Sequence, residues 1–358
     1  MVFFYILLFF VIGGIIRKQS LLVLVCLYVV LFVISIHFTE GYDLKNYEYG
    51  YNQSIINVDD DVMYRSAYFA TLITIMKFLG ISFFQFRILC FLLWSTSIFA
   101  FVLKYSTYPT WVIALCTLFP LLTFSSQMRN GIAISMVYFG LYILFKNNQK
   151  KGIIIYTILI LFSGLIHNIS YIYLLGIIAL GNKIKTGTLL RFSLYFSLFS
   201  IVLYGSGFLY WLVSHTLGSY YADLYFVRTD IFLISSIHYY IGIFVNLRFS
   251  FFVEKYERLH RTNNPFFWKF SRFVLRQNII LISAIPLLFV SMAFYRIFQN
   301  MFILTAITVA NTSSHYFVKG TDQRSFLRGA YLAFYICLTV LYNLSEGTFM
   351  EYWGSIVL

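Results

Sequence analysis

The stretch LLVLVCLYVVLFVISI at residues 21–36 contains no charged side chain. A second uncharged run, IILISAIPLLFV, covers residues 279–290. Transmembrane β-strands alternate apolar and polar residues, because one face meets lipid and the other faces the lumen. Both runs are instead continuously apolar, as in helices that cross a membrane. The pattern predicts an all-α, polytopic membrane protein.

The composition supports this class of protein. Hydrophobic residues make up 60% of the 358 residues, charged residues make up 11%, and the mean hydropathy is +0.81. About a quarter of the residues of an average soluble domain are charged. At about 20 residues per crossing, the chain has room for about twelve transmembrane helices and little else, so we predict a single integral-membrane domain over residues 1–358. The predicted spans are roughly 2–16, 20–38, 83–103, 109–126, 130–146, 152–166, 168–182, 189–214, 231–253, 276–294, 297–317 and 328–343.

Residues 66–80 are apolar enough to suggest a further crossing, but they are few and include Lys77. A crossing at this point would also place the acidic segment before it and Arg129 after it on opposite sides of the membrane. We therefore expect an amphipathic helix that lies in the outer interface.

The net charge of +13 is better explained by membrane orientation than by nucleic-acid binding. Cytoplasmic loops of membrane proteins are enriched in lysine and arginine. With the spans given above, most of these residues fall on one side, which includes the basic loop 254–276. The other side carries two outer segments, 39–82 and 215–230, that mix tyrosines with carboxylates. Carboxylates accept hydrogen bonds from sugar hydroxyls, and aromatic rings cover sugar C–H faces.

Two arginines stand at apolar boundaries that this orientation places on the outer side. Arg129 lies in SQMRNG (126–131), and Arg296 lies in YRIFQN (295–300). A charged side chain just inside a membrane boundary is costly unless it has an anionic partner. Structural pairing to a carboxylate is the alternative interpretation. We expect the two guanidinium groups to converge on an anionic group such as a lipid-linked phosphate.

Several motifs resemble those of the EpsG family, which belongs with the Wzy-type polysaccharide polymerases. The strongest match is QMRNGIAIS at 127–135, which is followed by LIHNIS at 165–170. Gly41-Tyr-Asp43 with Tyr47 resembles the start of the family's first outer loop. Arg296 with Asn300 resembles its late arginine element.

The resemblance implies a specific activity and location. Such enzymes join oligosaccharide repeat units carried on undecaprenyl pyrophosphate into O-antigen or a related surface polysaccharide. They work at the periplasmic face of the bacterial inner membrane, with a fold similar to that of metal-independent GT-C-type glycosyltransferases. The implied partners are the lipid-linked oligosaccharide, the bilayer and a separate chain-length regulator. No cofactor and no metal are expected.

The candidate catalytic residues follow from the chemistry of breaking a sugar–pyrophosphate bond. Arginine stays charged and binds phosphate oxygens with a planar fork, so Arg129 and Arg296 are expected to stabilise the leaving group. His167 is a candidate general base, and Asp43 is the alternative base or a sugar ligand. The candidate substrate-binding residues are Gln127, Asn130, Arg65, Arg87, Tyr47, Tyr220, Tyr221, Asp223 and Asn300.

Two other functions remain open at the level of the sequence. An O-antigen ligase would use the same donor with a different acceptor, but such ligases have a longer outer loop than 215–230. A flippase for lipid-linked sugars would need charged residues along a path through the membrane. When charged residues near the span ends are counted with the adjacent loops, only Arg248 is predicted to lie within a span, close to its inner end.

Overall fold

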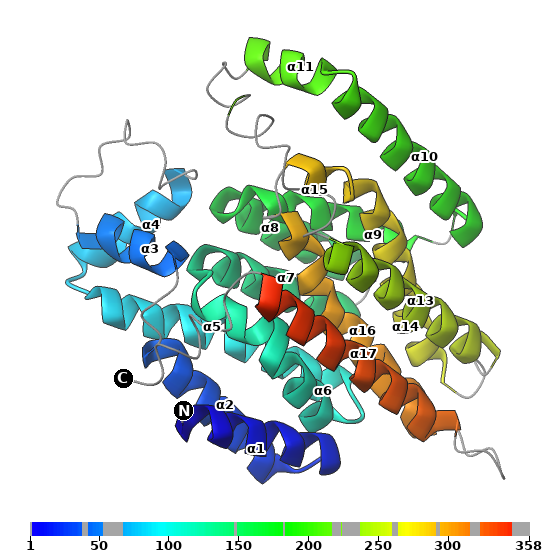
Figure 1. Cartoon of the computed structure of the whole chain (residues 1–358), viewed down its shortest axis with the longest axis horizontal. Coiled ribbons are helices and arrows are strands. Elements are labelled where there is room, and N and C mark those ends of the chain that lie inside the picture. Colours follow the sequence, from blue (N-terminus) through cyan, green and yellow to red (C-terminus); the bar gives the residue numbers. More distant parts are fainter. Residues whose placement is uncertain are drawn as a thin grey trace. The chain divides into compact units, whose positions relative to one another are not determined.

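The computed structural model of the chain describes residues 2–37, 42–52, 67–146, 149–181, 183–216, 223, 237–259, 264–290, 294–315 and 323–345. These residues form helices and turns, and no strand occurs among them (Figure 1). The predicted all-α class is therefore confirmed for the described part of the chain.

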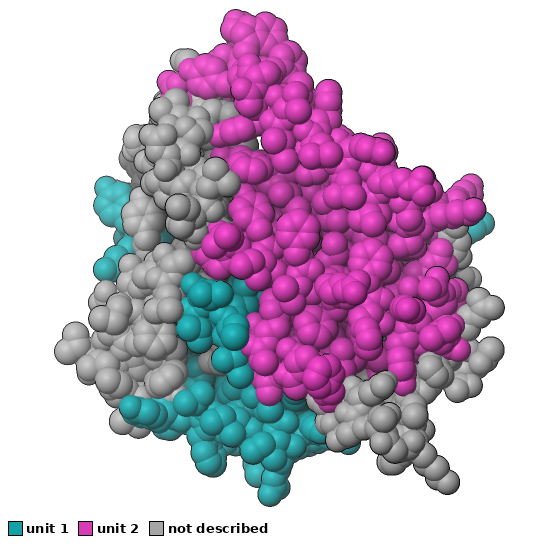
Figure 2. All heavy atoms as spheres, turned by 45° about the vertical axis from the view of Figure 1, so that its right-hand side comes forward, with its two compact units in different colours: residues 1–174, 313–315, 335–358 teal, residues 175–312, 316–334 magenta. Residues whose placement is uncertain are grey.

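The chain divides into two compact units, which Figure 2 distinguishes by colour. Unit 1 contains residues 1–174, 313–315 and 335–358, and unit 2 contains residues 175–312 and 316–334.

Unit 1 begins with two apolar helices and continues through the segments that carry most of the candidate site residues. Its described helices are α1 (Val2–Ile16), α2 (Leu21–His37), α3 (Tyr42–Asn52), α4 (Ala67–Phe78), α5 (Phe83–Tyr105), α6 (Pro109–Cys116), η1 (Thr117–Leu121), η2 (Leu122–Ser125), α7 (Met128–Lys146) and α8 (Gln149–Ile166), followed by η3 (Asn168–Leu175) at the border with unit 2.

Helix α5 starts at a sequence-encoded cap. The Ser82 hydroxyl accepts a hydrogen bond from the Gln85 backbone N–H over 3.3 Å, and the Ser82 N–H donates to Gln85 Oε1 over 2.8 Å. This reciprocal capping box satisfies two N–H groups that the first helical turn leaves without partners. The preceding Gly80 has a φ of +69°, a left-handed conformation that favours glycine. The cap and the glycine together fix the turn between α4 and α5.

The predicted span 109–126 is not one α-helix. Helix α6 ends at Cys116, and Phe119 has extended dihedral angles of −165° and 126°. Pro120, joined to Phe119 by a cis peptide bond, has no backbone N–H to donate. The π-helical turn η1 spans this break, and the 3-10 turn η2 then leads to Ser125. The residues of η2 after the break are buried, and they connect directly to the polar segment before α7.

Helix α7 packs between α5 and α8 in the core of unit 1. Gly131 allows the close approach of α5, because a Cβ there would lie 3.0 Å from Trp94 Cδ1. Gly140 does the same toward α8, where a Cβ would lie 3.0 Å from Tyr156 Cδ2. Small residues at such crossings are typical of membrane helices, whose association depends on close van der Waals contact.

Unit 2 is organised around α14. Its described helices are α9 (Gly176–Leu180), α10 (Thr186–Gly205), α11 (Phe208–Thr216), α13 (Ile237–Leu259), α14 (Pro265–Leu281), η5 (Ile282–Ala284), α15 (Leu287–Val290), α16 (Tyr295–His315, in unit 2 through Thr312) and α17 (Gln323–Ser345, in unit 2 through Phe334). Helix α14 contacts α9, α10 and α13.

Arg276 of α14 holds the connection between α9 and α10. The side chain is 1% exposed, and it donates to the Ile184 carbonyl over 2.6 Å and to the Ile178 carbonyl over 3.1 Å. Sequence reasoning placed this residue at a span boundary facing the cytoplasm. In the structure the guanidinium bonds one backbone carbonyl within α9 and one in the connection after it. Its fixed fork of donors is suited to this role.

The apolar helices are those of a membrane protein. Among the described residues, three helices are both long enough and apolar enough to cross a bilayer: α5, α7 and α10. Shorter apolar helices include Leu21–His37 and Phe326–Leu341. Twelve crossings and a GT-C-type fold stay predictions.

The predicted outer segments differ in how much of them the structure describes. Helix α4 confirms a helix within the predicted 66–80, whereas its place in the interface stays a prediction. Helix α3 was not predicted, because its polar sequence YDLKNYEYGYN lacks an apolar period. Most of the second segment, 215–230, lies outside the described residues.

Candidate functional site

The start of α7 carries a buried pair of amides. Gln127 is 8% exposed and Asn130 is 4% exposed, and Asn130 Nδ2 donates to Gln127 Oε1 over 3.0 Å. The Gln127 backbone N–H donates to the Thr123 carbonyl over 3.1 Å, and its carbonyl accepts from the Gly131 N–H over 2.8 Å. These bonds fix the short segment between η2 and α7, and they give both predicted polar residues a defined orientation.

Arg129 lies between these two residues in the first turn of α7 and is half-buried. Its Nε is buried and has no hydrogen-bond partner among the described residues. A buried donor without a partner costs free energy, and the N-terminal end of a helix already carries partial positive charge. The start of α7 therefore offers a cationic donor suited to an anionic ligand.

Arg87, a predicted substrate ligand, is engaged with the end of α2. Its side chain is 8% exposed, and NH2 donates to the Ser35 carbonyl over 2.6 Å. The Ser35 hydroxyl shares a hydrogen bond of 2.6 Å with the Ser125 hydroxyl at the end of η2. A cation at a helix C-terminus is favourable. Arg87 thus joins α5 to α2, and the serine pair joins α2 to the segment that leads to Arg129.

Helix α3 positions the candidates of the first outer segment beside α5. Glu48 interacts electrostatically with Arg87. The Tyr47 ring contacts the Phe69 ring of α4 edge-on at 5.6 Å between centroids. Asp43 lies in the first turn of α3 and is half-buried. The helix therefore carries two carboxylates and a tyrosine to the same end of unit 1 as Arg87.

Tyr51 fastens the other end of α3 to the turn before α5. Its hydroxyl donates to the Ile81 carbonyl over 2.7 Å, and its ring stacks on Phe86 at 5.6 Å between centroids. Burial raises the pKa of the Tyr51 phenol, and Cys90 adds to this shift. The phenol therefore stays a neutral hydrogen-bond donor at physiological pH.

His167 follows the last residue of α8 and is 5% exposed. Its backbone N–H donates to the Ser163 carbonyl over 2.8 Å, and its carbonyl accepts from the Ser170 N–H over 2.8 Å. The Ser163 hydroxyl in turn donates to the Ala133 carbonyl of α7 over 2.8 Å. This bond joins the last turn of α8 to α7 one turn beyond Arg129, so both candidates belong to the same helix pair.

Unit 2 holds the second predicted arginine. Arg296 lies in the first turn of α16 and is half-buried, and Asn300 follows one turn later, 2% exposed. Residues four apart share one face of a helix. The rings of Tyr295 and Tyr239 lie 4.2 Å apart between centroids, which joins this end of α16 to α13. His238 is 5% exposed beside Tyr239.

Two of these residues were missed at the level of the sequence. Gln299 is 1% exposed, and Tyr295 is 2% exposed beside Arg296. The sequence signal that could have identified them is the segment YRIFQN, in which the tyrosine and the glutamine lie within three residues of Arg296. The sequence does not show that this tyrosine and this glutamine are buried, because burial depends on the helices that pack against α16.

The remaining candidates are placed only in part. The Asp223 carboxylate accepts a hydrogen bond from the Tyr210 hydroxyl of α11 over 2.8 Å. Arg65, Tyr220 and Tyr221 lie outside the described residues. Unit 1 thus contains Asp43, Tyr47, Arg87, Gln127, Arg129, Asn130 and His167, and unit 2 contains Asp223, Arg296 and Asn300. Convergence of Arg129 with Arg296 stays a prediction.

A buried polar network holds the helices of unit 2 together. Asn278 Nδ2 donates to the Ser250 hydroxyl over 2.7 Å and to the Thr305 hydroxyl over 3.2 Å. The Tyr331 hydroxyl donates to Asn246 Oδ1 over 3.2 Å. These bonds join α13 to α14, α16 and α17. Such interhelical bonds between neutral side chains commonly stabilise membrane bundles.

The described helices are those of a polytopic membrane protein that carries arginines near helix N-termini. The family model described as the EpsG family matches residues 20–353, nearly the whole chain. The protein belongs to the EpsG family, a Wzy-type polymerase-like family, and membership supports a membrane polymerase-like role in surface polysaccharide biosynthesis. No curated protein and no solved structure matched it.

Proposed function

We propose that this protein polymerises oligosaccharide repeat units carried on undecaprenyl pyrophosphate into O-antigen or a related surface polysaccharide. The proposed place is the periplasmic face of a bacterial inner membrane. EpsG membership supports the polymerase class, and the residue chemistry at the start of α7 supports an anionic, lipid-linked donor.

One observation carries the proposal: the buried Nε of Arg129 has no hydrogen-bond partner in the described part of the chain. The neighbouring amides of Gln127 and Asn130 bond to each other. This bond fixes the segment and does not involve the guanidinium of Arg129. A phosphate oxygen would give Arg129 a charge-assisted hydrogen bond. A fixed cation of this kind stabilises the charge that develops on a leaving group without reorganising during the reaction.

The proposed reaction exchanges one glycosidic bond for another. The acceptor hydroxyl oxygen bonds to the anomeric carbon of the growing chain, and the bond from that carbon to the pyrophosphate oxygen breaks. The pyrophosphate leaves with the bonding electron pair, and Arg129 and Arg296 stabilise its charge. The hydroxyl proton passes to His167 or Asp43 as general base. No nucleotide sugar or metal enters this scheme.

A reconstituted assay tests the proposal. Purified protein in lipid nanodiscs is given a lipid-linked oligosaccharide, and both polymer length and released undecaprenyl pyrophosphate are measured. Loss of a preorganised donor to developing charge typically lowers kcat about 10²–10³-fold, so Arg129→Ala is expected to do the same. Lys146→Ala, an exposed cation in the last turn of the same helix, is the matched control. Normal polymer length in Arg129→Ala would remove the catalytic assignment.

The same assay distinguishes the alternatives. A ligase would transfer the chain to a lipid A core acceptor and would leave isolated repeats unjoined. A flippase would move the lipid-linked repeat across the nanodisc or vesicle membrane without releasing pyrophosphate. In cells, deletion should leave single repeats on the core for a polymerase and no repeats for a ligase.

A further inference from the structure

Two hollows flank the turn between α4 and α5 in unit 1. The first, of about 390 Å³, is lined by Leu79, Gly80, Ile81, Gln85, Ile88 and Leu89. The second, of about 320 Å³, is lined by Tyr51, Asn52, Lys77, Gly80, Ile81, Ser82 and Phe83. Both volumes fall within the roughly 300–1,000 Å³ of ligand sites in proteins. Gly80 and Ile81 border both hollows, so the two are adjacent.

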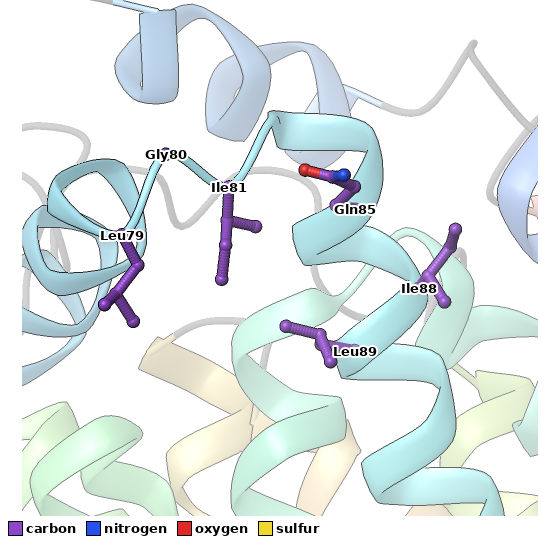
Figure 3. A pocket seen from close by; sticks show the side chains of 6 residues that line it. All are labelled: Leu79, Gly80, Ile81, Gln85, Ile88 and Leu89. Carbon is purple, nitrogen blue, oxygen red and sulfur yellow. The ribbon is translucent and has the colours of Figure 1, made fainter.

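The first hollow is apolar and open. In Figure 3, Leu79 and Ile81 point to the same side of the turn, and Leu89 points from α5 toward the space beneath them. Leu79 is 61% exposed and Leu89 is 39% exposed. The one polar side chain of the lining, Gln85, is engaged in the α5 capping box. Such a surface suits a hydrocarbon chain.

The second hollow is polar and carries a cation. Lys77 Nζ lies 6.0 Å from the centre of the Tyr51 ring, and Asn52 and Ser82 complete the polar part of the lining. The ammonium group makes this side of the turn complementary to a negatively charged head group. One hollow is apolar and the adjacent one is cationic, so together they are complementary to an amphiphile with an anionic head group.

The register of α5 relates these hollows to the candidate site. Successive residues of a helix are rotated by about 100°, so Gln85, Ile88 and Leu89 share one face and Arg87 lies on the opposite face. Phe83, in the second hollow, lies four residues before Arg87 and shares its face of the helix. Glu48 of α3 interacts with Arg87, and α3 ends at the second hollow with Tyr51 and Asn52. The cationic hollow therefore borders the side of α5 that carries Arg87, and the apolar hollow borders the opposite side.

We propose that the apolar hollow binds the first isoprene units of the lipid carrier and that the Lys77 hollow guides its pyrophosphate toward Arg129. The proposal rests on the proposed function, and it assigns a binding place on the protein to one part of that substrate. Of the amphiphiles that share this chemistry, it commits to the polyprenyl pyrophosphate rather than to a bulk anionic phospholipid.

Photo-crosslinking tests the site directly. The full-length protein in nanodiscs is exposed to a polyprenyl pyrophosphate that carries a diazirine near its head group, and labelled peptides are identified by mass spectrometry. We expect label on residues 77–89, competed by undecaprenyl pyrophosphate and not by phosphatidylglycerol. Label competed equally by both lipids, or label elsewhere only, would overturn the proposal.

Two matched variants test the same site through kinetics. Leu89→Trp fills the hollow, whereas Leu93→Trp enlarges an exposed residue of the same helix that does not line it. Because one methylene in an apolar pocket already changes specificity by about tenfold or more, Leu89→Trp should raise KM for the lipid-linked donor at least about tenfold, with kcat little changed. Lys77→Gln should also raise KM, and Lys104→Gln, at the other end of α5, should not. Unchanged KM in both Leu89→Trp and Lys77→Gln would contradict the site.

The outcomes separate this proposal from the proposed function. Polymerisation that continues without label on residues 77–89 would refute the lipid site and leave the polymerase assignment standing. Labelling of residues 77–89 without release of undecaprenyl pyrophosphate, under conditions where the protein is folded, would refute the polymerase and retain lipid binding.

Discussion

Asn130 Nδ2 donates to Gln127 Oε1 over 3.0 Å at the start of α7, on either side of Arg129 in the sequence. Both amides are buried, so bulk water contributes little to their hydrogen bonding. The pair fixes the polar turn while the Nε of Arg129 has no hydrogen-bond partner among the described residues. A neutral amide pair beside the arginine leaves its positive charge available to a phosphate, whereas a carboxylate in the same place would offset that charge.

The charge of this clamp can be tested with Gln127→Glu. The new carboxylate keeps the acceptor for Asn130 but places a negative charge beside Arg129, where it competes with phosphate. An unfavourable change of about 1.4 kcal/mol in the transition state lowers the rate tenfold, and we expect kcat/KM to fall by at least that factor. Gln127→Met, which removes the acceptor without adding charge, should have a smaller effect on activity. An equal loss in both variants would indicate a structural role only.

Arg87 is expected to contribute to stability through the Ser35 carbonyl. Arg87→Met leaves that carbonyl of α2 without its donor, and a lost hydrogen bond to a charged group costs about 1.5–3 kcal/mol. Thermal unfolding in detergent should show a lower midpoint than for the unaltered protein. Lys104→Met, an exposed cation at the other end of α5, is the control and should leave the midpoint unchanged.

Gly131 should resist enlargement. In Gly131→Ala the new Cβ would lie 3.0 Å from Trp94 Cδ1, so the Trp94 ring must shift by a few tenths of an ångström within a buried contact. Overpacking of this kind typically costs about 1–3 kcal/mol. Gly187→Ala in α10, where a Cβ would have nothing within 4 Å, should instead be neutral or stabilising by up to about 1 kcal/mol. Equal unfolding midpoints for the two variants would refute the close approach.

Replacing either of two neighbouring amide side chains of α14 by leucine should change the stability of the protein in opposite directions. Asn278→Leu removes donors from Ser250 and Thr305 and should destabilise the protein by about 1–3 kcal/mol. Gln277 is 2% exposed, and its amide nitrogen and oxygen have no hydrogen-bond partners among the described residues. Gln277→Leu should therefore be neutral or stabilising, because it removes buried polar groups without breaking a bond. Denaturation of the two variants side by side gives the sign of each effect.

The identity of the general base can be decided by two isosteric or near-isosteric changes. General base catalysis typically contributes about 10²–10⁴-fold to the rate. The polymerisation kcat should fall by this factor in either His167→Gln or Asp43→Asn, but not in both. The Ser163→Ala control removes the bond from α8 to the Ala133 carbonyl and reports the effect of merely loosening the His167 segment. A kcat for both variants no lower than that of Ser163→Ala would remove both candidates.

The sequence predicted helices correctly where apolar residues dominate a long segment. The apolar runs at α2, α5 and α7 predicted helices because backbone groups in lipid must be satisfied within the segment itself. It failed at the broken segment 109–126, where the apolar composition continues through Phe119 and Pro120 although the helix does not. It also missed α3, because that helix is ordered by tyrosine contacts with α4 and α5 rather than by an apolar stripe of its own.

By itself, the sequence determined the all-α membrane class, the family motifs and the type of chemistry at Arg129, since hydrophobicity and side-chain charge are properties of the residues alone. Only the tertiary structure decided which polar groups are already engaged. It showed that Arg87 is bonded to α2, that Gln127 and Asn130 bond to each other, and that the α4–α5 turn borders an apolar and a cationic hollow. The physical reason is that a polar side chain is available to a ligand only if the fold has not already supplied it with a partner, and those partners come from segments far away in the chain.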